Sequence, residues 1–108
     1  MQTISTNDLN KKLENNENIH LIDVLQPDAF REGHLPGAEN VPIGMDFEER
    51  IQQAVPDKSE EVVLYCASTD CPASEKAYQK MERLGYENIY DYEEGKAGWK
   101  EAGHALKS

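Results

Sequence analysis

The sequence predicts an α/β protein with a mainly parallel central sheet and helices on both faces. Short apolar runs typical of buried strands, at 19–24, 62–65 and 88–92, alternate with segments of helical spacing. Parallel strands need crossover connections, and the intervening helices supply them. A chain of 108 residues can bury one core, so we expect a single domain over 1–108.

The first expected elements lie before residue 19. A short strand is expected to begin at Ile4, and Ser5 or Thr6 can cap a helix that runs to about residue 15, with Leu9 on its apolar face. The polar run 15–18 predicts a turn. This helix and turn lead into the first buried strand.

The next elements surround a stretch rich in glycine and proline. The apolar run 19–24 predicts a buried strand, and 27–32 predicts a short helix that Gly33 ends. The backbone then turns, with a brief strand expected around Val41. Apolar spacing predicts a helix over 46–54, with Asp46 as its N-cap.

The second half of the chain contains the central strand. Four apolar residues at 62–65, bounded by polar residues, predict a strand covered on both faces. A helix is expected from Pro72, which suits the first helical position, and Gly85 suits its end. A strand at 88–92 and a final short helix that Gly103 ends complete the prediction.

The chemically informative residue is Cys66, which directly follows the central strand. Five residues further on, Cys71 precedes Pro72 and the predicted helix. A short loop that enters a helix directs backbone N–H groups and the positive end of the helix dipole to one point. A thiol held there is expected to have a lowered pKa and to be largely thiolate. The alternative is a buried structural cysteine; the strand–loop–helix context favours a reactive Cys66.

Composition limits the partners. The chain has 11 Lys plus Arg against 21 Asp plus Glu, a net charge of −10, which argues against nucleic acid and anionic membranes. No apolar run approaches membrane-spanning length, and the N-terminus lacks the pattern of a signal peptide. Two cysteines do not form a disulfide framework. We expect a cytoplasmic protein that is a monomer or a weak dimer.

Three segments in order resemble the rhodanese-like sulfurtransferases in single-domain form. They are Leu-Ile-Asp-Val at 21–24, Gly-His-Leu-Pro-Gly-Ala at 33–38, and the run 92–99 that contains glycine and ends in tryptophan. Cys66 stands where the family has its catalytic cysteine, and the resemblance covers about 4–106. The signature positions are Asp23, His34, Gly37, Gly95 and Trp99.

The resemblance implies a double displacement. Cys66 would take a sulfane sulfur from a donor, become a persulfide, and pass the sulfur to a thiol or another nucleophilic acceptor. The resemblance implies no metal and no organic cofactor. The persulfide would be held by backbone N–H groups of the loop, namely those of Ala67, Ser68, Thr69, Asp70 and Cys71.

The loop departs from the family's pattern. Cys71 occupies the position where the family often has an arginine, the loop has no cationic side chain, and Asp70 adds negative charge. An inward carboxylate raises the pKa of a neighbouring thiol. We therefore expect thiosulfate to be a poor donor, and a protein persulfide, a polysulfide or a small persulfide to be better ones. Leu25 and Glu94 also replace an arginine and a glycine of the family.

Alternatives remain open at the sequence level. Cys71 is either a resolving thiol that attacks a persulfide on Cys66, or a small residue at the start of the helix. The two cysteines also suit a thiol–disulfide redox or sensing protein. A non-catalytic rhodanese-like binding module is a third possibility, against which the presence of Cys66 argues. His34 is expected to fix its own turn, and Asp23 to accept hydrogen bonds from neighbouring loop N–H groups.

Overall fold

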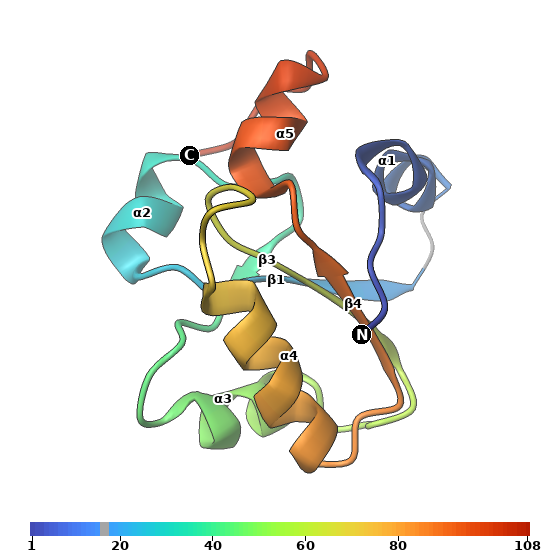
Figure 1. Cartoon of the computed structure of the whole chain (residues 1–108), viewed down its shortest axis with the longest axis vertical. Helices are drawn as coiled ribbons and strands as arrows, with labels where there is room; N and C mark the ends of the chain where they lie inside the picture. The colour runs from blue at the N-terminus through green and yellow to red at the C-terminus, as the bar shows by residue number, and fades with distance from the viewer. Residues whose placement is uncertain (16–17) are drawn as a thin grey trace.

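The computed structural model describes residues 1–15 and 18–108, and in it a parallel sheet lies between two layers of helices (Figure 1). Strands and helices alternate along almost the whole chain, as the sequence predicts. The elements are α1 (Thr6–Glu14), β1 (Ile19–Asp23), α2 (Pro27–Glu32), β2 (Glu39–Asn40), α3 (Phe47–Ala54), β3 (Glu61–Tyr65), α4 (Ala73–Arg83), β4 (Asn88–Tyr92) and α5 (Gly95–Glu101).

The sheet has the strand order β2-β1-β3-β4, and all its ladders are parallel. The register pairs Asp23 of β1 with Tyr65 of β3, and Tyr65 with Tyr92 of β4. The carboxyl ends of these three strands therefore lie at one edge. Cys66 leaves the sheet at that edge from an inner strand, where open α/β sheets place their functional groups.

The two faces of the sheet are covered by different helices (Figure 1). On one face, Leu64 of β3 packs in a cluster with residues of α3 and α4, and Cys66 belongs to this cluster. On the other face, Tyr65 packs in a second cluster with Leu9 of α1 and Trp99 of α5. The three-layer α/β prediction is therefore confirmed. Adjacent strand residues alternate between the two cores, so the period of the strand decides which core each residue joins.

Several expected bounds are confirmed. The helix at 27–32 and the strand at 88–92 have the predicted ends, and Gly85 follows α4 with a φ of 95°. Ser5 is the N-cap of α1, because its hydroxyl accepts a hydrogen bond from Asp8 N at 3.1 Å. Part of the turn expected at 15–18 lies outside the described residues.

Other expectations need correction. No strand forms at 4–6, where the chain goes directly into α1 after a single bridge between Thr3 and Asp91. The brief strand is β2, just before Val41 rather than around it. Asp46 occupies the N-cap of α3, but its side chain makes no capping hydrogen bond. Pro72 is the N-cap of α4 and not its first helical residue.

Among the helices of residues 1–15 and 18–108, none has the length and hydrophobicity that a bilayer crossing requires.

Candidate active site

The active-site loop, defined here as residues 66–71, is attached at its start to helix α5. Cys66 O accepts a hydrogen bond from Lys96 N at 3.1 Å, and Ala67 O accepts one from Ala97 N at 2.9 Å. The first N–H groups of a helix have no partner within the helix. Here α5 uses two of them to bind the carbonyl groups of the loop, which fixes the position of the Cys66 backbone.

Gly95 makes this close contact sterically feasible. Its φ is 61°, in the left-handed region, and a Cβ at this position would lie 2.3 Å from Cys66 O and 2.9 Å from the carbonyl carbon of Ala67. Neither backbone atom can move without displacing the loop. Glu94 has an ordinary helical φ of −67°, so the turn needs only one glycine and tolerates glutamate at the preceding position.

The Cys66 side chain is sealed inside the protein, with 1% of its surface exposed. Its thiol lies within donating distance of two oxygens, Cys71 O at 3.3 Å and Ser74 Oγ at 3.6 Å. Burial raises the pKa of Cys66, and donation to the neighbouring Cys71 thiol raises it further, while the hydroxyl and N–H of Ser74 lower it less. The expected lowering of the Cys66 pKa is therefore wrong, because burial outweighs the helix N-terminus.

Cys71 is the thiol that the backbone N–H groups favour. It is half-buried, and although burial raises its pKa, hydrogen bonds from the Cys66 thiol and from Ala67 N and Ala73 N bring the pKa below its usual range. The sequence predicts anion-stabilising surroundings for Cys66, and the cradle of loop N–H groups around a Cys66 persulfide stays a prediction. The N–H groups of the loop and of the start of α4 lie around Cys71 more than around Cys66.

The rest of the loop is a tight turn on the surface. Cys71 N donates to Ser68 O at 3.1 Å, and Ala67, Thr69 and Asp70 are exposed. Asp70 was expected to act on the reactive thiol if it pointed inward. The carboxylate whose charge raises the pKa of Cys71 is instead Asp23.

The sequence analysis did not select two buried polar residues on the α4 side of the sheet. Ser74, in the first turn of α4, is 3% exposed, and Asp91 on β4 is 2% exposed. Burial raises the pKa of Asp91, the Ser74 hydroxyl lowers it, and the charges of Glu93 and Glu75 raise it. The signal for Asp91 was its strand register: it pairs with Leu64, so its side chain takes the buried α4 face.

Residues 5–102 of the chain match the family description of the rhodanese-like domain. The chain belongs to the rhodanese-like family. No group of three or more His, Cys, Asp or Glu side chains in residues 1–15 and 18–108 is arranged to hold a metal ion.

Relatives with curated names agree with this family. PspE, a thiosulfate sulfurtransferase of Escherichia coli strain K12, is 36% identical over 70 residues, 65% of this chain and 64% of that protein. YrkF, a putative sulfur carrier protein of Bacillus subtilis strain 168, is 24% identical over 96 residues, 89% of this chain and 49% of that protein. The chain thus spans about half to two thirds of the length of these relatives.

The fold is also that of solved rhodanese structures. A thiosulfate sulfurtransferase from Pseudomonas aeruginosa superposes with a TM-score of 0.88, at 21% identity, over 99% of this chain and 20% of that one. At this identity the likeness supports the fold alone. The rhodanese-like family and its α/β fold, both expected from the three sequence segments, are confirmed.

The rhodanese-like signature residue Asp23 connects the ends of two strands. It is completely buried, and its Oδ1 accepts a hydrogen bond from Leu25 N at 2.8 Å. Burial raises the pKa of Asp23, while the Leu25 N–H and the Tyr65 hydroxyl lower it. The Tyr65 hydroxyl also accepts from Leu35 N at 3.0 Å. Asp23 thus organises the loops beside the site. Position 25 contacts it through the backbone N–H, so this contact does not depend on the arginine side chain that the family often has there.

The remaining signature residues hold turns at a distance from the thiols. His34 Nδ1 donates to Phe30 O at 3.0 Å, and its ring stacks on Phe30 with centroids 3.9 Å apart. Gly37 has a φ of 82°, which its turn requires. Trp99 is buried and donates from Nε1 to Ala105 O at 3.2 Å.

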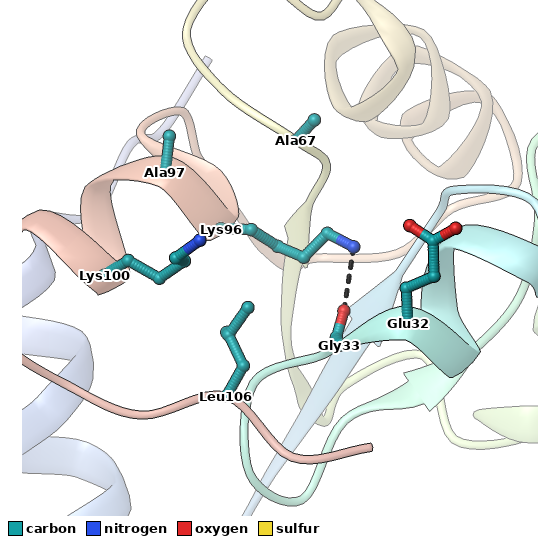
Figure 2. A pocket seen from close by; sticks show the side chains of 7 residues that line it. All are labelled: Glu32, Gly33, Ala67, Lys96, Ala97, Lys100 and Leu106. Carbon is teal, nitrogen blue, oxygen red and sulfur yellow. Dashed lines mark hydrogen bonds between the residues drawn. The ribbon is translucent and has the colours of Figure 1, made fainter.

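A hollow of about 330 Å³ opens beside the loop, between α2, α5 and the C-terminal segment (Figure 2). Lys96 and Lys100 from α5 lie at its wall with Ala67 of the loop. Figure 2 shows the Lys96 ammonium directed to the end of α2, where it donates to Gly33 O at 2.8 Å. Neither cysteine lines this hollow.

Proposed function

We propose that this protein is a sulfurtransferase, or a sulfane-sulfur carrier, that holds the transferred sulfur as a persulfide on Cys66. The observation that carries the proposal is the position of Cys66 in a rhodanese-like chain. It leaves an inner parallel strand, and its sulfur lies against the start of α4, where Ser74 offers an N–H and a hydroxyl. These groups favour a sulfur anion at this point.

The proposed reaction has two displacements on sulfur. In the first, the Cys66 sulfur attacks the sulfane sulfur of the donor, the bond between that sulfur and the rest of the donor breaks, and the donor leaves with the bonding pair and takes up the Cys66 proton. In the second, an acceptor thiolate attacks the outer sulfur, the S–S bond to Cys66 breaks, and Cys66 leaves with the bonding pair. Because the pKa of Cys66 is raised, its thiolate is a poor leaving group. The persulfide on Cys66 is therefore expected to persist until an acceptor arrives.

The donor is proposed to be a persulfide or polysulfide rather than thiosulfate. Residues 67–71 contain no cationic side chain that can bind two oxyanion oxygens, and Cys71 stands at the usual arginine position. Lys96 and Lys100 lie in the hollow on the far side of Ala67, and Lys96 is already hydrogen bonded to backbone carbonyls. Initial rates with inorganic polysulfide should exceed those with thiosulfate, and equal rates would contradict this choice.

A second candidate function is thiol–disulfide chemistry, which the contact between the two cysteines favours. The Cys66 thiol donates to Cys71 O at 3.3 Å, and each thiol shifts the pKa of the other, so the two residues are close neighbours. An oxidant, or attack of one thiol on the inner sulfur of a persulfide on the other, would join them. The latter step expels hydrosulfide and leaves a disulfide for a reducing thiol to reopen.

Intact mass of the reduced Cys71→Ser variant tests the proposal, because Cys66 is then its only thiol. After incubation with inorganic polysulfide and removal of excess reagent, we expect a gain of one sulfur atom, which a small thiol acceptor then removes. The Cys66→Ser/Cys71→Ser double variant is the matched control and should gain none. Wild type is loaded in parallel, and absence of extra sulfur from Cys66 in both wild type and Cys71→Ser would exclude Cys66 as the carrier.

A further inference from the structure

The two thiols differ in their access to solvent. Cys66 is 1% exposed and forms part of the core between the sheet and α4. Cys71 is half-buried and packs against the edge of the same core. It is the last residue of the active-site loop before Pro72, the N-cap of α4. The Cys66 backbone is held by α5 through the hydrogen bond from Lys96 N to Cys66 O. A donor that approaches from solvent therefore meets the Cys71 thiol before it meets Cys66.

The surroundings of Cys71 suit a nucleophile. The N–H groups of Ala67 and Ala73, at the two ends of the loop, lower the pKa of Cys71, and the neighbouring Cys66 thiol lowers it as well. All three contacts favour the thiolate, and the pKa of Cys71 is lowered while that of Cys66 is raised. The outer thiol is thus the more readily ionised of the two.

We propose that Cys71 is the outer thiol of a two-cysteine relay: it accepts sulfane sulfur from a persulfide donor and passes it inward to Cys66. This inference rests on the proposed function, to which it adds the route that the sulfur takes. It assigns to Cys71 a role before Cys66 in the transfer, and not only a resolving role after it.

Each step of the relay is balanced. The Cys71 thiolate attacks the outer sulfur of the donor persulfide, a new S–S bond forms, the donor's S–S bond breaks, and the donor leaves as a thiolate. The Cys66 sulfur then attacks the outer sulfur of the Cys71 persulfide, and the S–S bond to Cys71 breaks. The proton of the Cys66 thiol, which lies 3.3 Å from Cys71 O in the resting protein, passes to the departing Cys71 sulfur. No oxidant or reductant is needed.

The order of labelling in the wild-type protein tests the relay. Reduced protein is mixed with glutathione persulfide, quenched with an alkylating agent at increasing times, and cleaved on the amino side of Asp70, which separates the two cysteines. We expect the extra sulfur first on the fragment with Cys71 and later on the fragment with Cys66. Sulfur that appears on Cys66 from the earliest times, with none on Cys71, would overturn the relay.

Two variants make the test independent of time resolution. Cys66→Ser keeps a hydroxyl that can donate to Cys71, and we expect it to gain one sulfur on Cys71 at close to the wild-type rate. Cys71→Ser should load Cys66 about tenfold more slowly than wild type. If Cys66→Ser gains none and Cys71→Ser loads at the wild-type rate, the relay is wrong and the proposed function stands. If Cys71→Ser never loads while wild type carries sulfur on the fragment with Cys66, the relay is obligatory; if wild type never carries sulfur on that fragment, the proposed function fails.

Discussion

The two ends of the active-site loop are built differently. At the Cys66 end, the backbone is bonded to the first turn of α5, Gly95 lies against it, and the side chain is sealed in the core. At the Cys71 end, the chain makes a turn closed by Ser68 O and begins α4 without a side-chain cap. The Cys66 end fixes the position of the thiol that is proposed to store the sulfur. The Cys71 end is proposed to give the sulfur donor access to the site. Chemical reactivity and precise placement are therefore divided between two cysteines.

The largest expected effect concerns the fixed end. Gly95→Ala places a Cβ 2.3 Å from Cys66 O at a φ of 61°, so the loop must be displaced. We expect a loss of about 3 kcal/mol in the free energy of unfolding, measured by urea denaturation.

Gly103→Ala is the matched control for this prediction. Gly103 also has a positive φ, 91°, but an added Cβ would meet nothing within 4 Å. Its cost is confined to the left-handed backbone, about 1–2 kcal/mol. Equal losses in the free energy of unfolding for the two variants would mean that the close contact between Gly95 and the loop adds nothing to the cost of the left-handed backbone.

A smaller effect is expected on the reactivity of the inner thiol. Because the Ser74 hydroxyl lowers the pKa of Cys66, Ser74→Ala should raise it. In a Cys71→Ser background, alkylation of Cys66 at neutral pH should slow by about three- to tenfold, and its pH profile should move to higher pH. Gln79→Ala, an exposed change on α4, is the control. An unchanged profile would show that the Ser74 hydroxyl does not act on the Cys66 thiolate.

The buried carboxyl beneath Ser74 should appear in the pH dependence of stability. The pKa of Asp91 is raised above 3.8, chiefly by burial. The folded protein therefore holds this proton more tightly than the unfolded chain does. The contribution of Asp91 to stability is complete below pH 3.8 and is lost as the pH rises through the folded pKa.

Asp91→Asn removes this titration. Compared with wild type, we expect its free energy of unfolding to decline less, or to rise more, as the pH increases from about 4 to 7. Gln79→Ala, an exposed change on α4 that removes no titratable group, is the control and should run parallel to wild type. Parallel curves for Asp91→Asn as well would contradict the assigned titration.

The smallest expected effect is at the looser end. Cys71 is half-buried in a surface turn, and serine has nearly the same shape, so Cys71→Ser should change the free energy of unfolding by no more than about 0.5 kcal/mol. Urea denaturation of the reduced protein measures this. A larger loss would mean that Cys71 is a structural residue, and that loading defects of Cys71→Ser reflect a disturbed loop.

The sequence predicted most of the fold because its signals were local. The apolar runs of β1, β3 and β4 and the glycines after the helices decide strand and helix position over a few residues each. Cys66 at the end of the central strand was found in the same way. The shortest elements have the weakest sequence signals. The expected strand at 4–6 does not form, because α1 begins immediately after its N-cap at Ser5.

The electrostatics of the site depended on contacts that the sequence does not show. The start of α4 is one residue later than predicted, so the N–H groups near the thiols belong to Ala73 and Ser74. Burial of Cys66 reversed the expected direction of its pKa. The Ser74 hydroxyl of α4 lowers the pKa of Asp91 on β4, and this effect depends on the packing of α4 against β4.

The measurement that tests the account most directly is the location of sulfur in loaded wild-type protein at equilibrium. The protein is incubated with inorganic polysulfide, freed of excess reagent, alkylated, and cleaved before Asp70. The account predicts one extra sulfur on the fragment that contains Cys66, and its loss after a small thiol acceptor is added before alkylation. A Cys66 fragment without extra sulfur, whether unmodified or joined to Cys71 by a disulfide, would contradict it.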